Sequence, residues 1–194
     1  MSGVLRQSQG QHWQCNLTTN RERISSLVSS GHLSDVTLVF SDNRRIQAHK
    51  LILAMSSPVF EAMMYGAMAT NEITLACDSY EMFQLLLCYI YEEEINLSDV
   101  FVGIQMYHLA HRYQMDTLAL YCSKYLMGEV TPATLPLVYD TALLLEDFLL
   151  LHHCTEVLVM AADNVLESPE IIFMRRSSLW QLLTNRGSAC PLGL

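Results

Sequence analysis

A predicted β-hairpin that leads directly into a helical segment is the feature that most constrains the fold of this chain. Along residues 35–40 the apolar side chains of Val36, Leu38 and Phe40 share one face, as in a strand with one buried side. Turn-forming residues follow, and a second short strand ends near His49, so the pattern predicts a hairpin. A two-stranded hairpin is marginal in water, so this one needs further strands or helices packed against it.

The helical segment after the hairpin begins at Lys50 and is restarted at Ser57-Pro58. Serine is a favourable N-cap, and proline is well tolerated at the first helical position. Gly66 is the expected end of this second helix, and residues 72–76 predict a third strand.

The rest of the chain is predicted to be mainly helical. A short strand is expected at residues 95–97, and Thr131-Pro132 are expected to be the N-cap and first residue of a new helix. Other helices are predicted over residues 20–30, 78–91, 100–113 and 115–127. Residues 131–164 are predicted to be helical, with a pair of helices between 134 and 164, and short helices are expected after Ser168. This order predicts an α+β fold with a small three-stranded sheet and an all-helical extension.

The composition excludes several classes of function. Apolar residues make up 51% of the 194 residues, which is enough for a sizeable core. The net charge of −9 argues against nucleic-acid binding, which needs a basic surface. The N-terminus lacks the apolar core of a secretory signal, and no apolar run has the length of a membrane span. The six cysteines contain no C-x-x-C pair, so we expect reduced thiols in the cytoplasm, with the nucleus as a second location.

Catalytic and metal-binding candidates are weak. His49, Ser56 and Ser57 lie close together, but the sequence has no G-x-S-x-G elbow and no evident orienting carboxylate. Two histidine pairs could chelate zinc, yet neither lies in an H-E-x-x-H motif; they are His108 with His111, and His152 with His153 near Cys154. Glycine-rich phosphate loops are missing from the sequence. We therefore expect no enzyme activity, no cofactor and no metal.

For the apolar residues of two segments, the sequence does not decide between burial in the core and contact with a partner. From the residues alone, Met55 and Met63 are expected to fill the core, whereas Met68 follows the helix-ending Gly66, where burial is less expected. The helix over residues 20–30 carries an apolar stripe that could pack on its own domain or on a second copy.

Two segments carry a resemblance to a known family. "SDVTLVF" followed by "AHKLILAMSSPVFEAM" resembles the BTB (POZ) domain signature, in which an Asp-Val strand precedes H-K-x-x-L-A-x-x-S-x-x-F. Upstream, "HWQCNLTTNRERISSL" is similar to a segment of the BTB–BACK–PHR group, and "YIYEEEINL" also looks like that group. The resemblance implies a BTB domain at 18–129 and a partial BACK domain at 130–184 with 3-box-like helices. The polar residues 1–17 are expected to be a flexible N-terminus, and residues 185–194, which lack periodicity, a tail. A counterpart of the PHR domain is not expected in these 194 residues.

The resemblance implies a homodimer, or a dimer with another BTB protein. The implied dimer interface comprises Ile24, Leu27, Val28, Leu33, Ile52 and Met55.

The family also commonly provides adaptors for Cullin-3 ubiquitin ligases, through a hydrophobic-x-Glu motif before the third strand. The alignment places Met68-Ala69-Thr70 there, so a threonine stands where the family has glutamate. The implied Cullin-3 contacts are Met64, Met68, Ala69, Thr70 and Tyr113.

Three functions remain open. The leading interpretation is a dimeric, substrate-recruiting Cullin-3 adaptor whose substrate protein is unknown. The alternatives are a pure dimerisation or scaffold module, including a short form that regulates longer BTB proteins, and a transcription cofactor that relies on a DNA-binding partner.

Overall fold

The structure, a computed structural model, describes residues 17–92 and 95–160, which divide into two compact units. The first unit contains the chain up to Ser56 together with Phe60–Ile95, and the second contains Ser57–Val59 and the chain from Asn96 onward. The predictions for the N-terminus up to residue 16, the helices after Ser168 and the tail at 185–194 lie outside the described residues.

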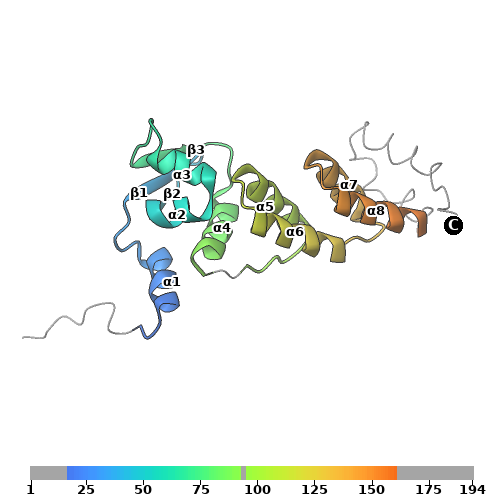
Figure 1. Cartoon of the computed structure of the whole chain (residues 1–194), viewed down its shortest axis with the longest axis horizontal. Coiled ribbons are helices and arrows are strands. Elements are labelled where there is room, and N and C mark those ends of the chain that lie inside the picture. Colours follow the sequence, from blue (N-terminus) through green and yellow to red (C-terminus); the bar gives the residue numbers. More distant parts are fainter. Residues whose placement is uncertain (1–16, 93–94, 161–194) are drawn as a thin grey trace, which may run out of the picture. The chain divides into compact units, whose positions relative to one another are not determined.

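A three-stranded mixed sheet is the centre of the first unit (Figure 1). Strands β1 (Val36–Phe40) and β2 (Arg45–Ala48) form the predicted hairpin, and β3 (Glu72–Leu75) lies on the other side of β1. The β1–β2 pair is antiparallel, whereas β1 and β3 are parallel. The expected strand at 95–97 was wrong, since these residues have no regular secondary structure.

Helix α1 (Asn20–Ser30) has well-defined ends. Thr19 and Glu22 form a capping box at its start, and Gly31 ends it with a left-handed backbone at φ 60°. A glycine suits this position because a side chain there would be strained and its Cβ would lie 2.6 Å from Oε1 of Gln47. The helix packs against α4 (Tyr80–Glu92) of the same unit.

The core of the first unit joins the inner face of β1 to the surrounding helices. Val36, Leu38 and Phe40 are all buried, as the alternation predicts. Phe83 of α4 packs edge-on against Phe40 and against Phe60, with ring centroids 5.5 and 6.0 Å apart. Helices α2 (Lys50–Ser56) and α3 (Pro58–Tyr65) confirm that the helical segment restarts at the proline.

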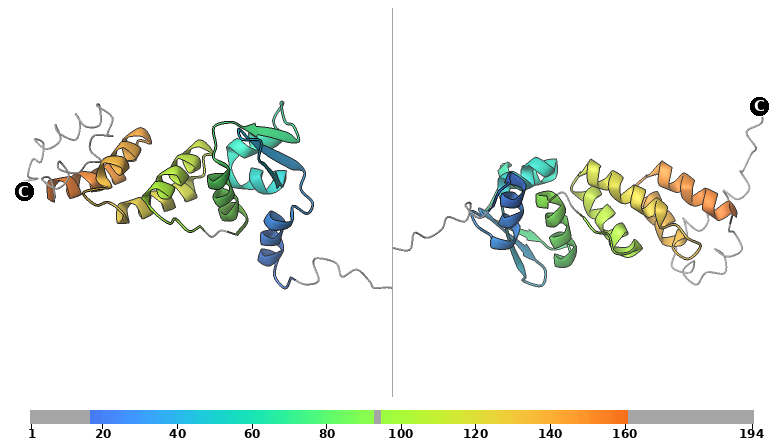
Figure 2. Two further views of the ribbon diagram at one scale, coloured as in Figure 1. Left: turned by 180° about the vertical axis from the view of Figure 1, so that it is seen from behind. Right: turned by 90° about the horizontal axis from the view of Figure 1, so that it is seen from below.

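The second unit consists of two helix pairs, α5 (Val100–Arg112) with α6 (Asp116–Gly128), and α7 (Leu135–Leu144) with α8 (Phe148–Met160). The members of each pair lie side by side in both views of Figure 2. Asp99 caps α5 by accepting hydrogen bonds from two backbone N–H groups.

One expectation for the second unit was wrong. Helix α7 begins at Leu135 rather than at Pro132, because Thr131 and Thr134 first form a hydrogen-bonded turn. The helical pair expected within residues 134–164 is confirmed as far as Met160: α7 ends at Leu144, Glu146 adopts a positive φ of 55°, and α8 follows. Over the described residues, no helix has the length and apolar character needed to cross a bilayer.

Candidate protein-interaction surfaces

His49 lies at the junction between β2 and α2, where it holds the chain to α4. Its Nε2 lies 2.7 Å from the carbonyl oxygen of His32, and its Nδ1 lies 2.8 Å from the hydroxyl of Tyr91. Because a carbonyl can only accept, Nε2 carries the proton, and in the neutral ring Nδ1 accepts from the tyrosine. The Tyr91 hydroxyl also accepts from the backbone N–H of His49 at 3.0 Å, and burial raises the pKa of Tyr91 to about 12. Both ring nitrogens of this 8% exposed histidine therefore have structural partners.

The two serines also make structural hydrogen bonds. The Ser56 hydroxyl donates to the carbonyl of Ile52, one helical turn earlier, at 2.9 Å. The Ser57 hydroxyl donates to the carbonyl of Tyr113 and is 2% exposed. A serine hydroxyl has one proton, and both serines donate it to a backbone carbonyl rather than to a general base.

The histidine pairs lie on helices α5 and α8. His152 and His153 are 3.6 and 4.0 Å from the carboxylate of Glu156, and all three side chains are substantially exposed. In the described part of the chain, no group of three or more His, Cys, Asp or Glu side chains is placed to hold a metal ion. The four described cysteines are not in disulfides, and burial raises the pKa of the Cys122 and Cys154 thiols to about 12.

The predicted dimer residues lie in the first unit with much of their apolar surface uncovered. Leu33 is 70% exposed, Met55 is 78% exposed and Ile24 is 41% exposed. Leu27, Val28 and Ile52 are half-buried, and α1 has no fully buried residue although it packs on α4. The expectation that Met55 fills the core was wrong for the single chain. Leu51, which is 62% exposed beside Ile52, was not predicted as a surface residue.

Leu33 is unusual in its backbone as well as in its exposure. Its φ of 63° lies in the left-handed region, which is an outlier for a bulky side chain. Such strain persists where the surrounding structure requires it, and it is frequent at binding sites. A strained, exposed leucine between α1 and β1 therefore marks this segment as a candidate contact surface.

Met68 lies in the loop between α3 and β3 and is 94% exposed. The neighbouring Ala69 and Thr70 are also exposed, and the Thr70 hydroxyl donates to the carbonyl of Glu72. This hydrogen bond fixes Thr70 against the start of β3. The predicted exposure of Met68 is confirmed, and its thioether side chain is suited to binding an apolar pocket on a partner.

Two of the predicted Cullin-3 contacts are buried instead. Met64, four residues before Met68 and still within α3, is 1% exposed, and Tyr113, the C-cap of α5, is 3% exposed. A fully covered side chain offers almost no surface to a partner, so neither residue is retained in the contact set. The helical register explains Met64, because it follows the buried Phe60 by four residues on the same face of α3.

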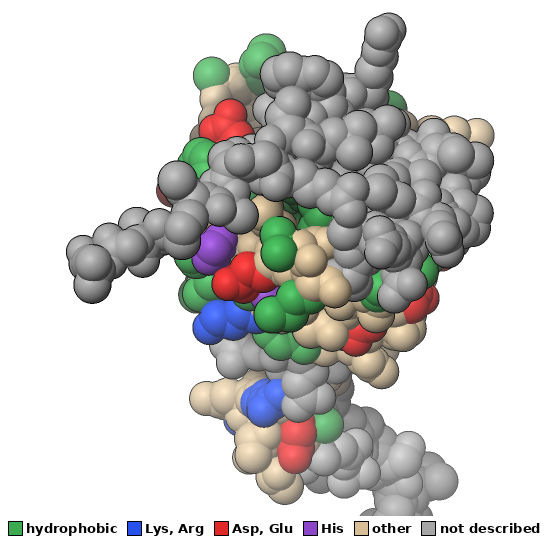
Figure 3. All heavy atoms as spheres, turned by 90° about the vertical axis from the view of Figure 1, so that its right-hand side faces the viewer, with side chains coloured by type: hydrophobic (Ala, Val, Ile, Leu, Met, Phe, Trp, Pro, Cys, Tyr) green, Lys and Arg blue, Asp and Glu red, His purple; other side chains and the backbone are tan. Residues whose placement is uncertain are grey.

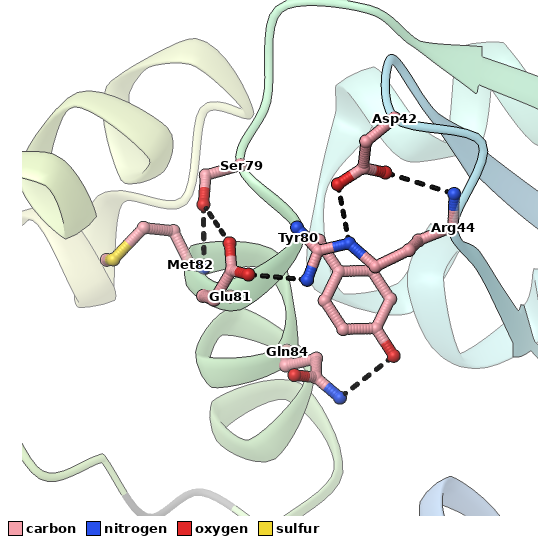
Figure 4. Close-up of polar contacts among 7 residues, drawn as sticks. All are labelled: Asp42, Arg44, Ser79, Tyr80, Glu81, Met82 and Gln84. Carbon is pink, nitrogen blue, oxygen red and sulfur yellow. Dashed lines mark hydrogen bonds and ion pairs between the residues drawn. The ribbon is translucent and has the colours of Figure 1, made fainter.

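A cluster of charged side chains joins the β1–β2 turn to the start of α4 (Figure 4). The Arg44 guanidinium donates to the carboxylates of Asp42 and Glu81 and lies 4.1 Å from the ring centroid of Tyr80. The hydrogen bond from Arg44 lowers the pKa of Glu81 to about 2. The ion-paired side chains are 43–65% exposed, so this cluster orients the turn more than it stabilises the fold.

In the second unit, Asp147 connects three helices. One carboxylate oxygen accepts from the hydroxyls of Tyr107 in α5 and Ser123 in α6, at 2.7 and 2.5 Å. The other accepts from the backbone N–H groups of Leu149 and Leu150 at 3.1 and 3.0 Å, and so caps α8. Burial raises the pKa of Asp147, but these hydrogen bonds outweigh it and hold the pKa below its ordinary value. This role of Asp147 was not predicted from the sequence, since its side-chain partners are 24 and 40 residues away.

The described surface is mixed in character. On the face drawn in Figure 3, hydrophobic, acidic and basic side chains are interspersed. With a net charge of −9 for the chain, this arrangement does not resemble the continuous basic surface that nucleic acids require.

A small mixed sheet enclosed by helices, with exposed apolar residues in its loops, defines an α+β protein-interaction domain. The chain belongs to the BTB/POZ domain family, whose model matches residues 24–129. Proteins of this family act as protein-interaction modules, in agreement with the exposed apolar residues described above.

Two curated relatives agree with this assignment, and one solved structure is reported beside them for comparison. BTB/POZ domain-containing protein 6 of Homo sapiens is 30% identical over 177 residues, covering 89% of this chain and 33% of the relative. BTB/POZ domain-containing protein 3 of Homo sapiens is 30% identical over 162 residues, covering 81% of this chain and 31% of that protein. The solved BTB domain of zebrafish PATZ1 is 20% identical with a TM-score of 0.48, over 54% of this chain and 85% of the other. The chain thus spans about a third of the length of the curated relatives it matches.

Proposed function

We propose that this chain is a dimeric adaptor that binds the N-terminal region of Cullin-3 and brings a substrate protein to the ubiquitin ligase. The observation that carries the proposal is Met68, an apolar side chain that is 94% exposed in the loop before β3. The BTB resemblance assigns the Cullin-3 contact to this loop. In this proposal the chain has no catalytic role and acts in the cytoplasm, with the nucleus as a second location.

Dimerisation would cover the apolar residues of the first unit. Leu33, Leu51 and Met55 are each more than 60% exposed, and burying such side chains is the main favourable term in association. Burying a single side chain of this size contributes about 2 kcal/mol, so a contact that buries several would offset much of the cost of association.

Cullin-3 binding would depend on Met68 as an apolar anchor. Thr70 stands where the family motif has glutamate, and its hydroxyl is already engaged with the carbonyl of Glu72. Without this carboxylate, Cullin-3 binding should be weaker, or less sensitive to salt concentration, than in a family member with glutamate.

Helices α7 and α8 are proposed to be the start of a BACK domain, which in related adaptors enlarges the cullin interface. Their surface includes Phe148 and Leu149, which are 77% and 70% exposed at the start of α8. The chain spans about a third of the length of its curated relatives. Both the region that would bind a substrate and the substrate itself are therefore proposals.

The mechanism would be geometric. A dimer presents two cullin-binding loops, and a substrate held by either protomer stays at high effective concentration near the ligase. A bound dimer therefore increases the time that substrate and ligase spend together without any chemistry by the adaptor itself.

Calorimetric titration of the full chain with the N-terminal region of Cullin-3 tests the proposal. We expect binding with a dissociation constant between about 0.1 and 10 µM, weakened at least tenfold by Met68→Asp, because a charge cannot enter an apolar pocket. Thr70→Glu should restore the family motif and tighten binding severalfold.

A matched control separates the two surfaces. Met55→Asp changes an equally exposed methionine on the proposed dimer surface and should leave the affinity of each protomer for Cullin-3 within about twofold. Unchanged binding by Met68→Asp would remove this loop from the interface. Absence of Cullin-3 binding at tens of micromolar would favour the alternative, a non-catalytic dimerisation or scaffold module that pairs with longer BTB proteins.

A further inference from the structure

Strand β2 forms an edge of the sheet and turns part of its backbone away from β1. The Phe40 N–H donates to the Arg44 carbonyl at 3.0 Å, and the Thr37 N–H donates to the Asn71 carbonyl, toward β3, at 2.8 Å. Hydrogen-bonded pairs alternate along an antiparallel ladder, so Ile46 and Ala48 are the β2 residues that bond to β1. The backbone groups of Arg45 and Gln47 therefore point outward.

The outward backbone groups of β2 are available for pairing. Within the described residues, the N–H and carbonyl groups of Arg45 and Gln47 make no hydrogen bond beyond the strand, and both residues are exposed. An open edge of this kind is a template for an additional strand. It differs from the edge at β3, whose flanking loop carries Met68.

A cavity of about 320 Å³ lies beside this edge, within the first unit. Its apolar wall includes Val28 of α1, Ile46 of β2 and Leu87 of α4. The rim is polar and uncharged over much of its length, with Ser30 and Gln84 among its residues. Its volume is at the lower end of the range for ligand pockets, which suits one or two side chains.

The register of the sheet connects the edge to the cavity. Ile46 pairs with the buried Leu38, so its side chain is on the inner face of the sheet. A residue added opposite Ile46 would place its side chain on that same inner face, beside Ile46 and Leu87. The neighbouring residues of the added strand would lie on the outer face and remain in solvent.

We propose that the open edge of β2 and the adjoining cavity form a binding site for an extended peptide segment of a partner protein, which adds a strand to the sheet. The main chain of the peptide would bond to the outward groups of Arg45 and Gln47, and one inward apolar side chain would fill the cavity. Edge pairing then supplies affinity and the cavity supplies selectivity, the division of roles that strand addition uses elsewhere.

The end of α1 favours a bare peptide over a second copy of this sheet. Residues 29–31, at the end of α1, line the same cavity as β2. In a second copy the same residues would lie beside its own β2, so two copies could pair these edges only by bringing both α1 helices to the same place. A single extended segment needs only the width of one strand, about 5 Å. The cavity shares Val28 with the predicted dimer interface, but neither Met68 nor the exposed Met55 lines it, so peptide binding can be tested separately from the Cullin-3 contact.

Blocked pentapeptides of sequence Ser-Thr-X-Thr-Ser, labelled with fluorescein, provide a direct probe, with X as Val, Leu, Phe, Glu or Lys. Fluorescence anisotropy with the full chain should give dissociation constants below about 1 mM for apolar X, and at least tenfold weaker binding for Glu and Lys. Amide resonances of Arg45 and Gln47 should shift on addition of the leucine peptide.

Two variants test the geometry. Gln47→Pro removes an outward N–H that the β1–β2 ladder does not use, so the fold should persist while peptide binding falls about tenfold or more. Gln47→Ala keeps that N–H and should bind within about twofold of the original chain. Gln84→Trp, which fills the cavity from α4, should also abolish selectivity for apolar X and covers the case in which the proline variant does not fold.

Three results would overturn the proposal. The first is no binding by any of the five peptides at about 1 mM. The second is equal binding by folded Gln47→Pro, or by Gln84→Trp if the proline variant does not fold. The third is a loss of self-association in Gln47→Pro without an effect on peptides, which would assign this edge to pairing between copies of the chain.

Discussion

In each unit, one buried or half-buried polar residue holds helices in place through several hydrogen bonds. The group is the imidazole ring of His49 in the first unit and the carboxylate of Asp147 in the second. In the first unit, the two ring nitrogens of His49 bond to the Tyr91 hydroxyl and to a backbone carbonyl. In the second unit, Asp147 is a carboxylate that accepts four hydrogen bonds from three helices. Groups that could suggest catalysis thus have structural partners in both units. The proposed interaction role therefore rests on exposed apolar residues such as Met68.

From this comparison we predict that removing the Asp147 carboxylate, here called the charged hub, lowers the free energy of unfolding more than the other changes below. Asp147→Ala removes the cap of α8 and leaves the hydroxyls of Tyr107 and Ser123 without their acceptor. We expect a loss of about 3 kcal/mol in the free energy of unfolding, measured by urea denaturation. Glu156→Ala, at an exposed position on the same helix, is the control and should change stability by less than about 0.5 kcal/mol. Equal effects of the two variants would contradict the hub assignment.

The charge of Asp147 also gives its contribution a pH dependence. Its pKa is below the ordinary value of 3.8 in the folded chain, so its stabilising effect is fully present above the unfolded pKa. The effect is lost as the pH falls through the folded pKa. In Asp147→Asn the loss of stability between pH 6 and about pH 3 should therefore be smaller than in the original chain. An identical slope in both proteins would mean that this carboxylate is not preferentially ionised when folded.

The contact between His49 and Tyr91 should be less costly to break. Tyr91→Phe keeps the ring but removes the hydroxyl that accepts from the His49 N–H and bonds to its Nδ1. We expect a loss of about 2 kcal/mol, because buried polar groups on His49 lose their partner. Tyr65→Phe, at a position that is 57% exposed, is the matched control and should have little effect. The comparison would be wrong if Tyr91→Phe exceeded Asp147→Ala in cost.

A change at Leu33 should separate strain from binding. Leu33→Gly relieves a left-handed backbone that disfavours a bulky side chain, so the isolated protomer should gain about 1 kcal/mol. The same change removes a 70% exposed apolar side chain and should weaken the proposed dimer. Denaturation at low and high protein concentration measures both effects. A variant that is more stable and equally dimeric would exclude Leu33 from the interface.

The smallest effect is expected at the exposed charge cluster. Glu81→Gln weakens the ion pair with Arg44 shown in Figure 4, where both side chains are substantially exposed. Its effect on stability should be slight at low ionic strength and vanish in high salt. A large, salt-insensitive loss would show that the turn between β1 and β2 depends on this contact.

Much of the first unit could be predicted from the sequence because its signals are local. The alternation at Val36, Leu38 and Phe40 and the proline at Pro58 each specify an element within a few residues. The error at Thr131 has a local cause too, since a threonine-proline pair fits a turn as well as a helix start.

The candidate surfaces could be predicted only in part, because burial depends on distant contacts. Met64 and Met68 are four residues apart in similar sequence surroundings, yet one is 1% exposed and the other 94%. Gly66 ends the helix between them and takes Met68 off the buried face. The Asp147 hub and the cavity beside β2 were missed for the same reason, since each joins residues from separate helices and strands.

The mass of the complex with the N-terminal region of Cullin-3, measured by light scattering after gel filtration, tests the central claim most directly. The account predicts two 22.0 kDa chains and two cullin fragments in one particle. Met55→Asp with Leu33→Asp should reduce this to one of each, and Met68→Asp should leave a dimer without cullin. A monomer of the unmodified chain, or a Met68→Asp protein that still carries two cullin fragments, would contradict the account.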